Sequence, residues 1–394
     1  MKLLHRNVPL LSVAQALMMS CNSLIVATAA LVGYNLAIDK SLATLPLAVQ
    51  FIAVMCTSIP AAMVMEKIGR KTAFLIACGF GVGGGVLTST AIINGNFWLF
   101  VCGTALIGIF NGFGNYYRFT AADSVELAYK SKAVSYTMLG GVVAAVAGPS
   151  LARMSREWIG DAEFAGSYMA IIFIYLASFA VLSFLHIEDK GSRRSAKKES
   201  GRPIKEIVSQ AEYIVALICG TLGYAIMSFV MTATPLAMDQ AAFLFADTAI
   251  VIQWHVMAMF APSFFTGTLI LRFGVLRIMF TGAVFGVLCI AINLLGGSFN
   301  HFLIALVFLG LSWNFLFVGA TTLLTETYAS SERNKAQAVN DFVIFSTVSV
   351  GSLSSGALQN AFGWKTVNLG AIPFLLIIFL AIAWLKRHRN ARPE

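Results

Sequence analysis

Charge is what this chain has least of. Aspartate, glutamate, lysine and arginine make up only 11% of its 394 residues, whereas hydrophobic residues make up 58%. An ordinary soluble domain is about a quarter charged, so one water-facing core could not hide the apolar side chains of this sequence. The apolar runs are continuous instead of alternating, which argues against a β-barrel. The composition therefore predicts an all-α membrane protein with spanning helices of roughly 20 residues each.

Paired cysteines and clustered acids are also missing from the sequence. The six cysteines show no CxxC spacing and all fall within apolar runs, so disulfides and zinc sites are not expected. The GxGxxG-like run from Gly79 to Gly84 lies inside an apolar run and lacks the preceding strand of a dinucleotide site. No nucleophile–base set or group of acids occurs at membrane depth. These absences argue against an enzyme and predict a protein without metal or cofactor.

Twelve apolar runs are long enough to cross a bilayer. They lie near residues 9–33, 44–65, 72–93, 97–118, 133–152, 166–186, 211–232, 248–271, 275–296, 300–323, 336–358 and 366–385. A single long polar stretch, rich in lysine and arginine, separates the sixth run from the seventh. We therefore predict two six-helix halves, residues 1–187 and 211–394, joined by a cytoplasmic linker over residues 188–210.

The net charge of +9 follows a pattern typical of membrane topology. With the N-terminus inside, only Lys40, Arg153, Arg156 and Lys365 of the 27 lysines and arginines fall on the outer side. Cytoplasmic loops of membrane proteins carry such an excess of basic residues. The distribution predicts an inner-membrane protein with both termini in the cytoplasm, in contact with lipid and not with nucleic acid.

The two halves repeat each other weakly at a nearly constant offset of 202 or 203 positions. The matched pairs are Gln50 with Gln253, Pro60 with Pro262, Asn111 with Asn314, Asp123 with Glu326, and Lys132 with Lys335. Several matches at one offset indicate a duplicated six-helix unit. Transporters built from parallel repeats hold their substrate between the halves, near the middle of the membrane.

The loop between the second and third spans, AMVMEKIGRKT, combines an acid, several bases and a turn glycine. The residues concerned are Glu66, Lys67, Gly69, Arg70 and Lys71. Gly69 permits a tight reversal of the chain. A weaker copy with Gly267, Arg272 and Gly274 follows the eighth span, and its two glycines keep the seven-residue spacing of Ala62 and Gly69.

This loop and its copy resemble the signature of the major facilitator superfamily, bacterial type. The twelve spans in two halves and the long basic central loop extend the resemblance over the whole chain. It implies two pseudo-symmetric bundles that alternate between outward- and inward-open states, with helices one, four, seven and ten lining the cavity. The sequence departs from the signature at Ala62, Glu66 and Leu271. Thr104 and Ala144 replace an arginine and a glycine typical of proton-driven drug exporters, which weakens that interpretation.

Polar and aromatic residues at membrane depth are candidate substrate contacts, because lipid offers them no partner. Asn111, which Asn314 repeats, is the strongest candidate, followed by Gln50 and Gln253; the alternative is hydrogen bonding between helices. The further candidates, each with packing as its alternative, are Asn22, Asn115, Tyr117, Tyr224, Trp254, His255 and Trp313.

Charged residues near the span ends are candidates for gating. Arg118 is a topology anchor, a cytoplasmic gate that pairs with Glu66 or Asp123, or a ligand for an anionic substrate. Asp123 and its counterpart Glu326 belong to the cytoplasmic edge. His255 and Asp341 are candidates for proton coupling, since a histidine switches near physiological pH; a hydrogen-bonded structural role is the alternative for His255.

The sequence thus predicts a monomeric secondary transporter that moves a small organic solute across the inner membrane by alternating access. The polar, weakly charged candidates favour a neutral or anionic solute with hydrogen-bonding groups. Proton coupling, proton-driven efflux of drugs or other organic compounds, and uptake of a vitamin or siderophore all remain open alternatives.

Overall fold

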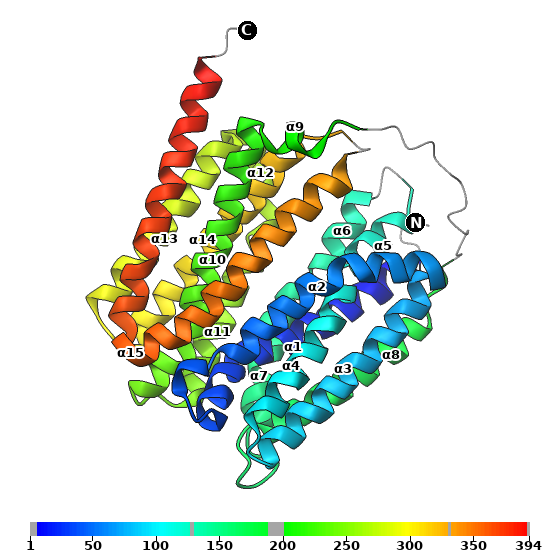
Figure 1. Ribbon diagram of the computed structural model, residues 1–394, viewed down its shortest axis with the longest axis vertical. Coiled ribbons are helices and arrows are strands. Elements are labelled where there is room, and N and C mark those ends of the chain that lie inside the picture. Colours follow the sequence, from blue (N-terminus) through cyan, green and yellow to red (C-terminus); the bar gives the residue numbers. More distant parts are fainter. Residues whose placement is uncertain (1–5, 127–129, 188–200, 330–331, 392–394) are drawn as a thin grey trace.

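The computed structural model describes residues 6–126, 130–187, 201–329 and 332–391, and every regular element among them is helical. The N-terminal half contains α1 (Asn7–Leu36), the short 3-10 helix η1 (Lys40–Leu42), α2 (Leu45–Ile68), α3 (Arg70–Ile93), α4 (Phe97–Gly114), α5 (Tyr117–Asp123), α6 (Lys130–Met138), α7 (Gly140–Ser155) and α8 (Ala165–Ser183). The short helix α9 (Ile204–Val208) lies in the predicted linker, and the C-terminal half contains α10 (Ala211–Gln240), α11 (Phe245–Phe260), α12 (Ser263–Phe273), α13 (Val275–Leu295), α14 (Phe299–Thr325) and α15 (Arg333–Asn390). Figure 1 shows the two sets of helices side by side.

The number of spanning helices differs from the simple expectation of twelve. By length and composition, ten helices of the described residues can cross a membrane, or eleven if the bent pair α11 and α12 forms one span. The predicted spans 336–358 and 366–385 both fall within α15, which the non-helical Gly363 divides into two helices. The all-helical membrane fold is therefore confirmed, whereas the count of twelve stays a prediction.

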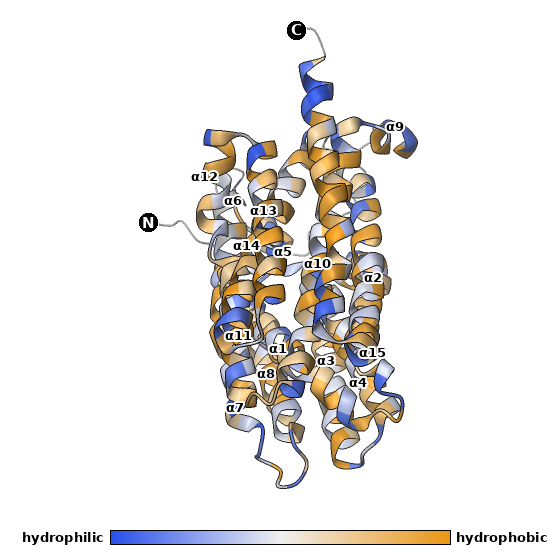
Figure 2. Ribbon diagram, turned by 90° about the vertical axis from the view of Figure 1, so that its left-hand side faces the viewer, coloured by the Kyte–Doolittle hydropathy of each residue, from blue (hydrophilic) through white to orange (hydrophobic). Residues whose placement is uncertain are grey.

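The outer faces of the helices are apolar. Phe173, Leu271 and Leu380 are 62%, 89% and 70% exposed, respectively. In water such exposure would cost roughly 25 cal/mol for each Å² of apolar surface, but hydrocarbon removes that cost. Figure 2 shows hydrophobic residues along the length of the helices and hydrophilic residues at α9 and at the end of α15. The surface is thus suited to a bilayer.

The signature loop and its copy adopt the same turn. Gly69 joins α2 to α3 with φ 87° and ψ 151°, and Gly274 joins α12 to α13 with φ 88° and ψ 147°. A side chain rarely tolerates this backbone conformation, which explains why both positions are glycine. The matched prolines differ, however: Pro60 lies inside α2, whereas Pro262 lies at the 43° bend between α11 and α12.

The halves contact each other most closely at one end. Thr44, just before α2, is buried and donates a hydrogen bond to the carbonyl oxygen of Leu353 in α15 at 3.2 Å. At the same end, the rings of Phe164 and Phe245 meet edge to face at 4.8 Å. Figure 1 shows α2 and the first part of α15 diverging from here toward the end that carries α6 and α9. We call this contact between η1, α2 and α15 the end contact.

Gly356 to alanine is expected to loosen the end contact. A Cβ at Gly356 would lie 2.5 Å from Thr44 Oγ1, so α2 and α15 would have to separate. Overpacking costs about 1–3 kcal/mol, and the lower part of this range corresponds to a roughly 5- to 10-fold loss of transport. Initial transport rates in proteoliposomes provide the measurement. Gly351 to alanine on the same helix is the matched control, because its Cβ meets nothing closer than 3.6 Å; equal rates for both variants would contradict the prediction.

The described part of the predicted linker, residues 201–210, contacts the loop before α15, whereas residues 188–200 lie outside the described residues. The buried carboxylate of Glu332 accepts hydrogen bonds from the backbone nitrogen, Nε and Nη2 of Arg202 at 2.7, 2.9 and 2.8 Å. The backbone nitrogen of Ala329 donates a further bond at 3.0 Å. These contacts lower the pKa of Glu332 to about 2, from an ordinary value of 4.5, with the Arg202 hydrogen bonds as the largest cause.

This lowered pKa predicts an acid-sensitive contribution to stability. Because the folded-state pKa lies below the unfolded one, Glu332 stabilises the fold fully above pH 4.5 and loses that effect as the pH falls toward 2. Glu332 to glutamine is therefore expected to show a shallower decline of the unfolding midpoint over this interval, followed by tryptophan fluorescence. The exposed Glu66 to glutamine is the control and should decline as the wild type does. Superimposable curves for wild type and Glu332 to glutamine would refute the assignment.

Candidate functional site

Three amide side chains that the sequence singled out meet inside the N-terminal half. Asn22 of α1 accepts two hydrogen bonds at Oδ1, from Gln50 Nε2 of α2 at 3.1 Å and from Asn111 Nδ2 of α4 at 2.7 Å. Gln50 and Asn111 are buried, whereas Asn22 is half-buried. We call Asn22, Gln50 and Asn111 the amide cluster.

The amide cluster has unused hydrogen-bonding capacity. Gln50 Oε1 and Asn111 Oδ1 are buried and find no partner among the described residues. Within the same residues, the amide nitrogen of Asn22 donates no hydrogen bond. A buried polar atom without a partner costs about 1–3 kcal/mol. The cluster therefore offers two acceptors and a donor to the polar edge of a ligand.

Five rings of the C-terminal half form a second group, the aromatic cluster. They are Tyr224 of α10, Phe260 of α11, Trp313 and Phe317 of α14, and Phe345 of α15. Trp313 and Phe317 stack with centroids 4.9 Å apart and planes 9° apart, because residues four positions apart share a helix face. Tyr224 meets both of these rings edge to face, at 5.5 and 5.7 Å. The cluster thus combines one stacked pair of rings, Trp313 and Phe317, with a third ring, Tyr224, that meets them edge to face.

The aromatic cluster lies where the two halves touch. The ring of Phe260 occupies the place that a Cβ on Gly141 of α7 would need, with ring atoms 2.7 Å from it. Next to Phe345, the Ser346 hydroxyl contacts the sulfur of Met55 in α2 at 3.1 Å. The indole nitrogen of Trp313 is buried and has no partner in the described part of the chain. The aromatic cluster and the unpaired indole N–H of Trp313 therefore lie beside the N-terminal half.

Asn314 has different surroundings from Asn111, its counterpart in the repeat. Its Nδ2 donates to the carbonyl oxygen of Met259 and to Ser263 Oγ, and its Oδ1 accepts from Thr266 Oγ1, all within 2.6–2.7 Å. Asn314 is completely buried and joins α14 to both sides of the bend between α11 and α12. Asn314 thus uses its amide to connect the two sides of a bent helix pair, whereas Asn111 keeps an acceptor that is unpaired among the described residues.

The three neighbouring candidates on α11 point in different directions. His255 is fully buried, with Nδ1 bonded to the carbonyl oxygen of Leu306 at 2.8 Å and Nε2 without a partner among the described residues. Trp254 is 51% exposed, and Gln253 is half-buried. The structure brings none of these three into the amide cluster.

Two candidates near the end of α4 are also placed apart from the amide cluster. Tyr117, at the start of α5, is completely buried with its ring edge to face against Phe74 at 4.9 Å. Asn115 is half-buried and follows α4 as its C-cap residue, with its backbone nitrogen bonded to the carbonyl oxygen of Asn111. Their surroundings are those of helix packing and helix termination.

The signature loop is tied to the end of α5. Arg70 Nη2 lies 2.8 Å from Asp123 Oδ2, and Arg70 Nη1 donates to Thr120 Oγ1 at 3.4 Å. In the C-terminal half, the counterpart Glu326 pairs at 2.6 Å with Arg389 near the end of α15. The other loop residues are Glu66 and Lys67, both exposed, Lys71, which is half-buried, Gly267, with open space beside it, and Arg272, which lies over the ring of Phe273.

Arg118 and Asp341 bring opposite charges together from the two halves. Arg118 of α5 lies over the ring of Phe119 at 4.8 Å, and its charge interacts with that of Asp341 in α15. Asp341 is exposed and accepts a hydrogen bond from Asn340 Nδ2 at 3.2 Å. This pair lies toward the end of the molecule where α2 and α15 diverge.

Sequence reasoning missed Phe260, Phe317 and Phe345. The chain has 31 phenylalanines, and lipid-facing helices also use this residue, so the count carried no signal. The four-residue spacing from Trp313 to Phe317 was the one local pattern that could have found part of the cluster. Phe260 and Phe345 come from other helices, and only the packing places them beside Trp313.

Comparisons with known proteins agree with this architecture. The model of the Major Facilitator Superfamily matches residues 11–254 and 217–394. The riboflavin transporter RfnT of Brucella anthropi is 37% identical over 390 residues, a match that covers 99% of this chain and 98% of that protein. The uncharacterized MFS-type transporter YdeG of Bacillus subtilis is 28% identical over 332 residues, covering 79% of this chain and 76% of that protein.

Solved structures share the fold at low sequence identity. The xylose transporter XylE of E. coli, in a partially occluded inward-open conformation, matches with a TM-score of 0.71 and 12% identity, covering 95% of this chain and 96% of that one. The nucleoside transporter NupG matches with a TM-score of 0.68 and 14% identity, covering 96% and 98%. At such identities the likeness concerns the fold alone.

Proposed function

This chain belongs to the major facilitator superfamily and is a membrane transporter, and on that premise we propose that its solute is a flavin of the riboflavin type. The observation that carries the proposal is that the two halves contribute different kinds of side chain. One half supplies unsatisfied amides and the other supplies stacked rings. The 37% identity to a riboflavin transporter over nearly the whole chain supports the same solute class.

The chemistry of an isoalloxazine ring complements both clusters. Its pyrimidinedione edge carries two carbonyls on either side of an N–H. The N–H would donate to Asn111 Oδ1 or Gln50 Oε1, and a carbonyl would accept from the amide nitrogen of Asn22. The flat, apolar part of the ring would stack on Trp313 and Phe317, an interaction worth about 1–3 kcal/mol for a base on an aromatic side chain. A plain sugar would satisfy the amides but leave the rings unused.

We infer the orientation of the protein in the membrane from the distribution of its basic residues. The basic residues predicted for one side include Arg70, Arg202 and Arg389, all of which lie with their ion-pair partners at the end away from the end contact. We place this end, with both termini, in the cytoplasm of a cell with an inner membrane. The end contact then closes the outer side, and the chain is in an inward-facing state of a monomeric alternating-access transporter.

Asp341 is the better supported of the two candidates for proton coupling. Its carboxylate is exposed between the halves and interacts with the charge of Arg118. A proton bound there would release Arg118 and change the attraction between α5 and α15. His255, in contrast, is sealed inside the C-terminal half and bonded to a backbone carbonyl. We therefore assign coupling to Asp341 and an inter-helix hydrogen bond to His255.

Transport assays with the purified protein in liposomes test the proposal. Saturable uptake of riboflavin is expected, with competition by lumiflavin, which has the same ring without the ribityl chain, and none by ribitol or xylose. If ribitol competed and lumiflavin did not, or if riboflavin were not transported at all, a site that recognises the isoalloxazine ring would be refuted. An imposed pH gradient should accelerate uptake by the wild type but not by Asp341 to asparagine; a wild-type rate that ignores the gradient would refute the coupling and leave the solute assignment standing.

A further inference from the structure

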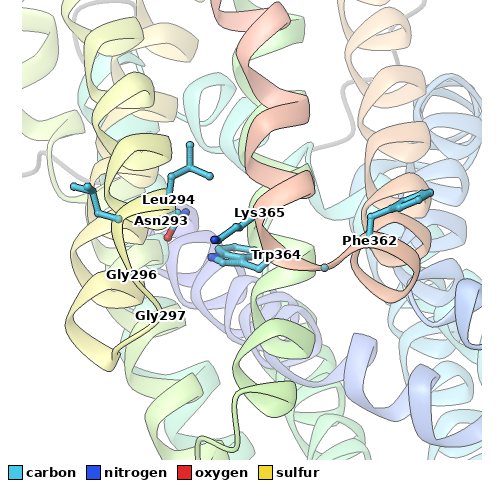
Figure 3. Close-up of a pocket in the computed structure, with 9 residues that line it drawn as sticks. Asn293, Leu294, Gly296, Gly297, Phe362, Trp364 and Lys365 are labelled. Atoms are coloured by element: carbon cyan, nitrogen blue, oxygen red, sulfur yellow. The ribbon is translucent and has the colours of Figure 1, made fainter.

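A pocket of about 420 Å³ lies outside both clusters. It is formed by the end of α13, the loop before α14 and the bend of α15, so the C-terminal half alone builds it. Figure 3 shows Asn293, Trp364 and Lys365 pointing into the same space between α13 and the second part of α15. The pocket is at the end of the bundle that carries the end contact, opposite the chain's C-terminus.

Several polar atoms of this pocket lack partners in the part of the chain that the structure describes. Asn293 is 3% exposed and its Oδ1 has no hydrogen bond among the described residues, although its Nδ2 donates to Asn368 Oδ1 at 2.8 Å. The indole nitrogen of Trp364 is also buried and unpaired there. Lys365 makes no ion pair with any residue that the structure describes. One acceptor, one neutral donor and one cation are therefore left for a ligand.

The backbone adds two further donors. Gly296 and Gly297 line the pocket, and neither backbone N–H donates to a described residue. No acidic side chain is among the residues that line the pocket. Successive backbone N–H groups beside a lysine and an indole form a typical anion site. The charge and donor count fit a phosphate group.

The margin of the pocket is apolar. Leu295 is 79% exposed and Phe362 is 69% exposed, and both line the pocket. Tryptophan and lysine at the end of a spanning helix are typical of the head-group level of a bilayer. A ligand that carries a phosphate and also covers exposed leucine and phenylalanine is an amphiphile.

We propose that this pocket binds the head group of an anionic phospholipid from the outer leaflet, of the phosphatidylglycerol type. The phosphate accepts from Lys365 Nζ, Trp364 Nε1 and the glycine N–H groups, and a head-group hydroxyl donates to Asn293 Oδ1. The acyl chains lie over Leu295 and Phe362. The inference is independent of the solute that the transporter carries.

Native mass spectrometry of the full-length protein, released from mixed phosphatidylglycerol and phosphatidylcholine micelles, tests the site. The wild type is expected to retain one phosphatidylglycerol. Lys365 to glutamine should reduce its retention about 10-fold, and Trp364 to phenylalanine, which keeps the ring against Phe302, about 3-fold. Arg153 to glutamine removes another exposed outer cation, from α7, and should leave retention unchanged.

Three outcomes would overturn the assignment. The first is equal retention of phosphatidylcholine, and the second is wild-type retention of phosphatidylglycerol by both pocket variants. The third is displacement of the lipid by millimolar glycerol 3-phosphate, which would show that the pocket takes a soluble phosphate instead. A melting midpoint close to that of the wild type establishes that each variant is folded, and if Lys365 to glutamine fails this check, Trp364 to phenylalanine decides.

Discussion

Asn111 to leucine is expected to weaken riboflavin binding roughly 10- to 100-fold without unfolding the protein. Leucine keeps the branched outline and the number of side-chain heavy atoms of asparagine but removes both the bond to Asn22 and the spare Oδ1. Leaving one buried partner unpaired costs about 1–3 kcal/mol, and each 1.4 kcal/mol corresponds to a factor of ten. Equilibrium binding followed by flavin fluorescence, and uptake in proteoliposomes, should fall together.

Thr104 to alanine is the matched control for Asn111. Thr104 is also buried on α4, but among the described residues its hydroxyl bonds only to the carbonyl oxygen of Val101 on the same helix. It should bind riboflavin as the wild type does. A folded Asn111 to leucine variant with unchanged affinity would remove the amide cluster from the binding site.

Trp313 to leucine is expected to have an effect of similar size through a different interaction. The variant loses the stack on Phe317 and the edge contacts with Tyr224 and Phe260. Stacking of a flat ring on an aromatic residue is worth about 1–3 kcal/mol, so affinity should fall roughly 5- to 100-fold. The quenching of flavin fluorescence on binding, which a stacked indole produces, should fall as well.

Trp254 to leucine provides the comparison for Trp313. Both changes remove one indole from the C-terminal half, but Trp254 is 51% exposed and is not one of the five rings of the aromatic cluster. Its loss should change neither affinity nor quenching. If Trp254 to leucine abolished quenching while Trp313 to leucine preserved it, the flavin would lie outside the interface between the halves.

Asn111 and Asn314 show how far a sequence repeat predicts structure. Their offset of 203 positions suggested a duplicated unit, and Gly69 and Gly274 share one turn conformation. The repeat did not reveal that Pro262 bends its helix pair by 43° while Pro60 lies within an unbroken α2. At the bend, Asn314 bonds to Met259, Ser263 and Thr266, so both polar atoms of its side chain already have hydrogen-bond partners.

The amino-acid sequence by itself determined the solvent in which this protein folds and the family to which it belongs. With 11% charged residues and long continuous apolar runs, only membrane helices satisfy the backbone hydrogen bonds, and the turn glycines fix the signature loops locally. Tertiary structure alone decided which polar atoms stay unsatisfied. Whether an amide reaches a partner depends on side chains from other helices, as Asn22, Gln50 and Asn111 show, and local sequence does not encode those distances. The aromatic cluster has the same origin, because its five rings come from four helices that only packing brings together.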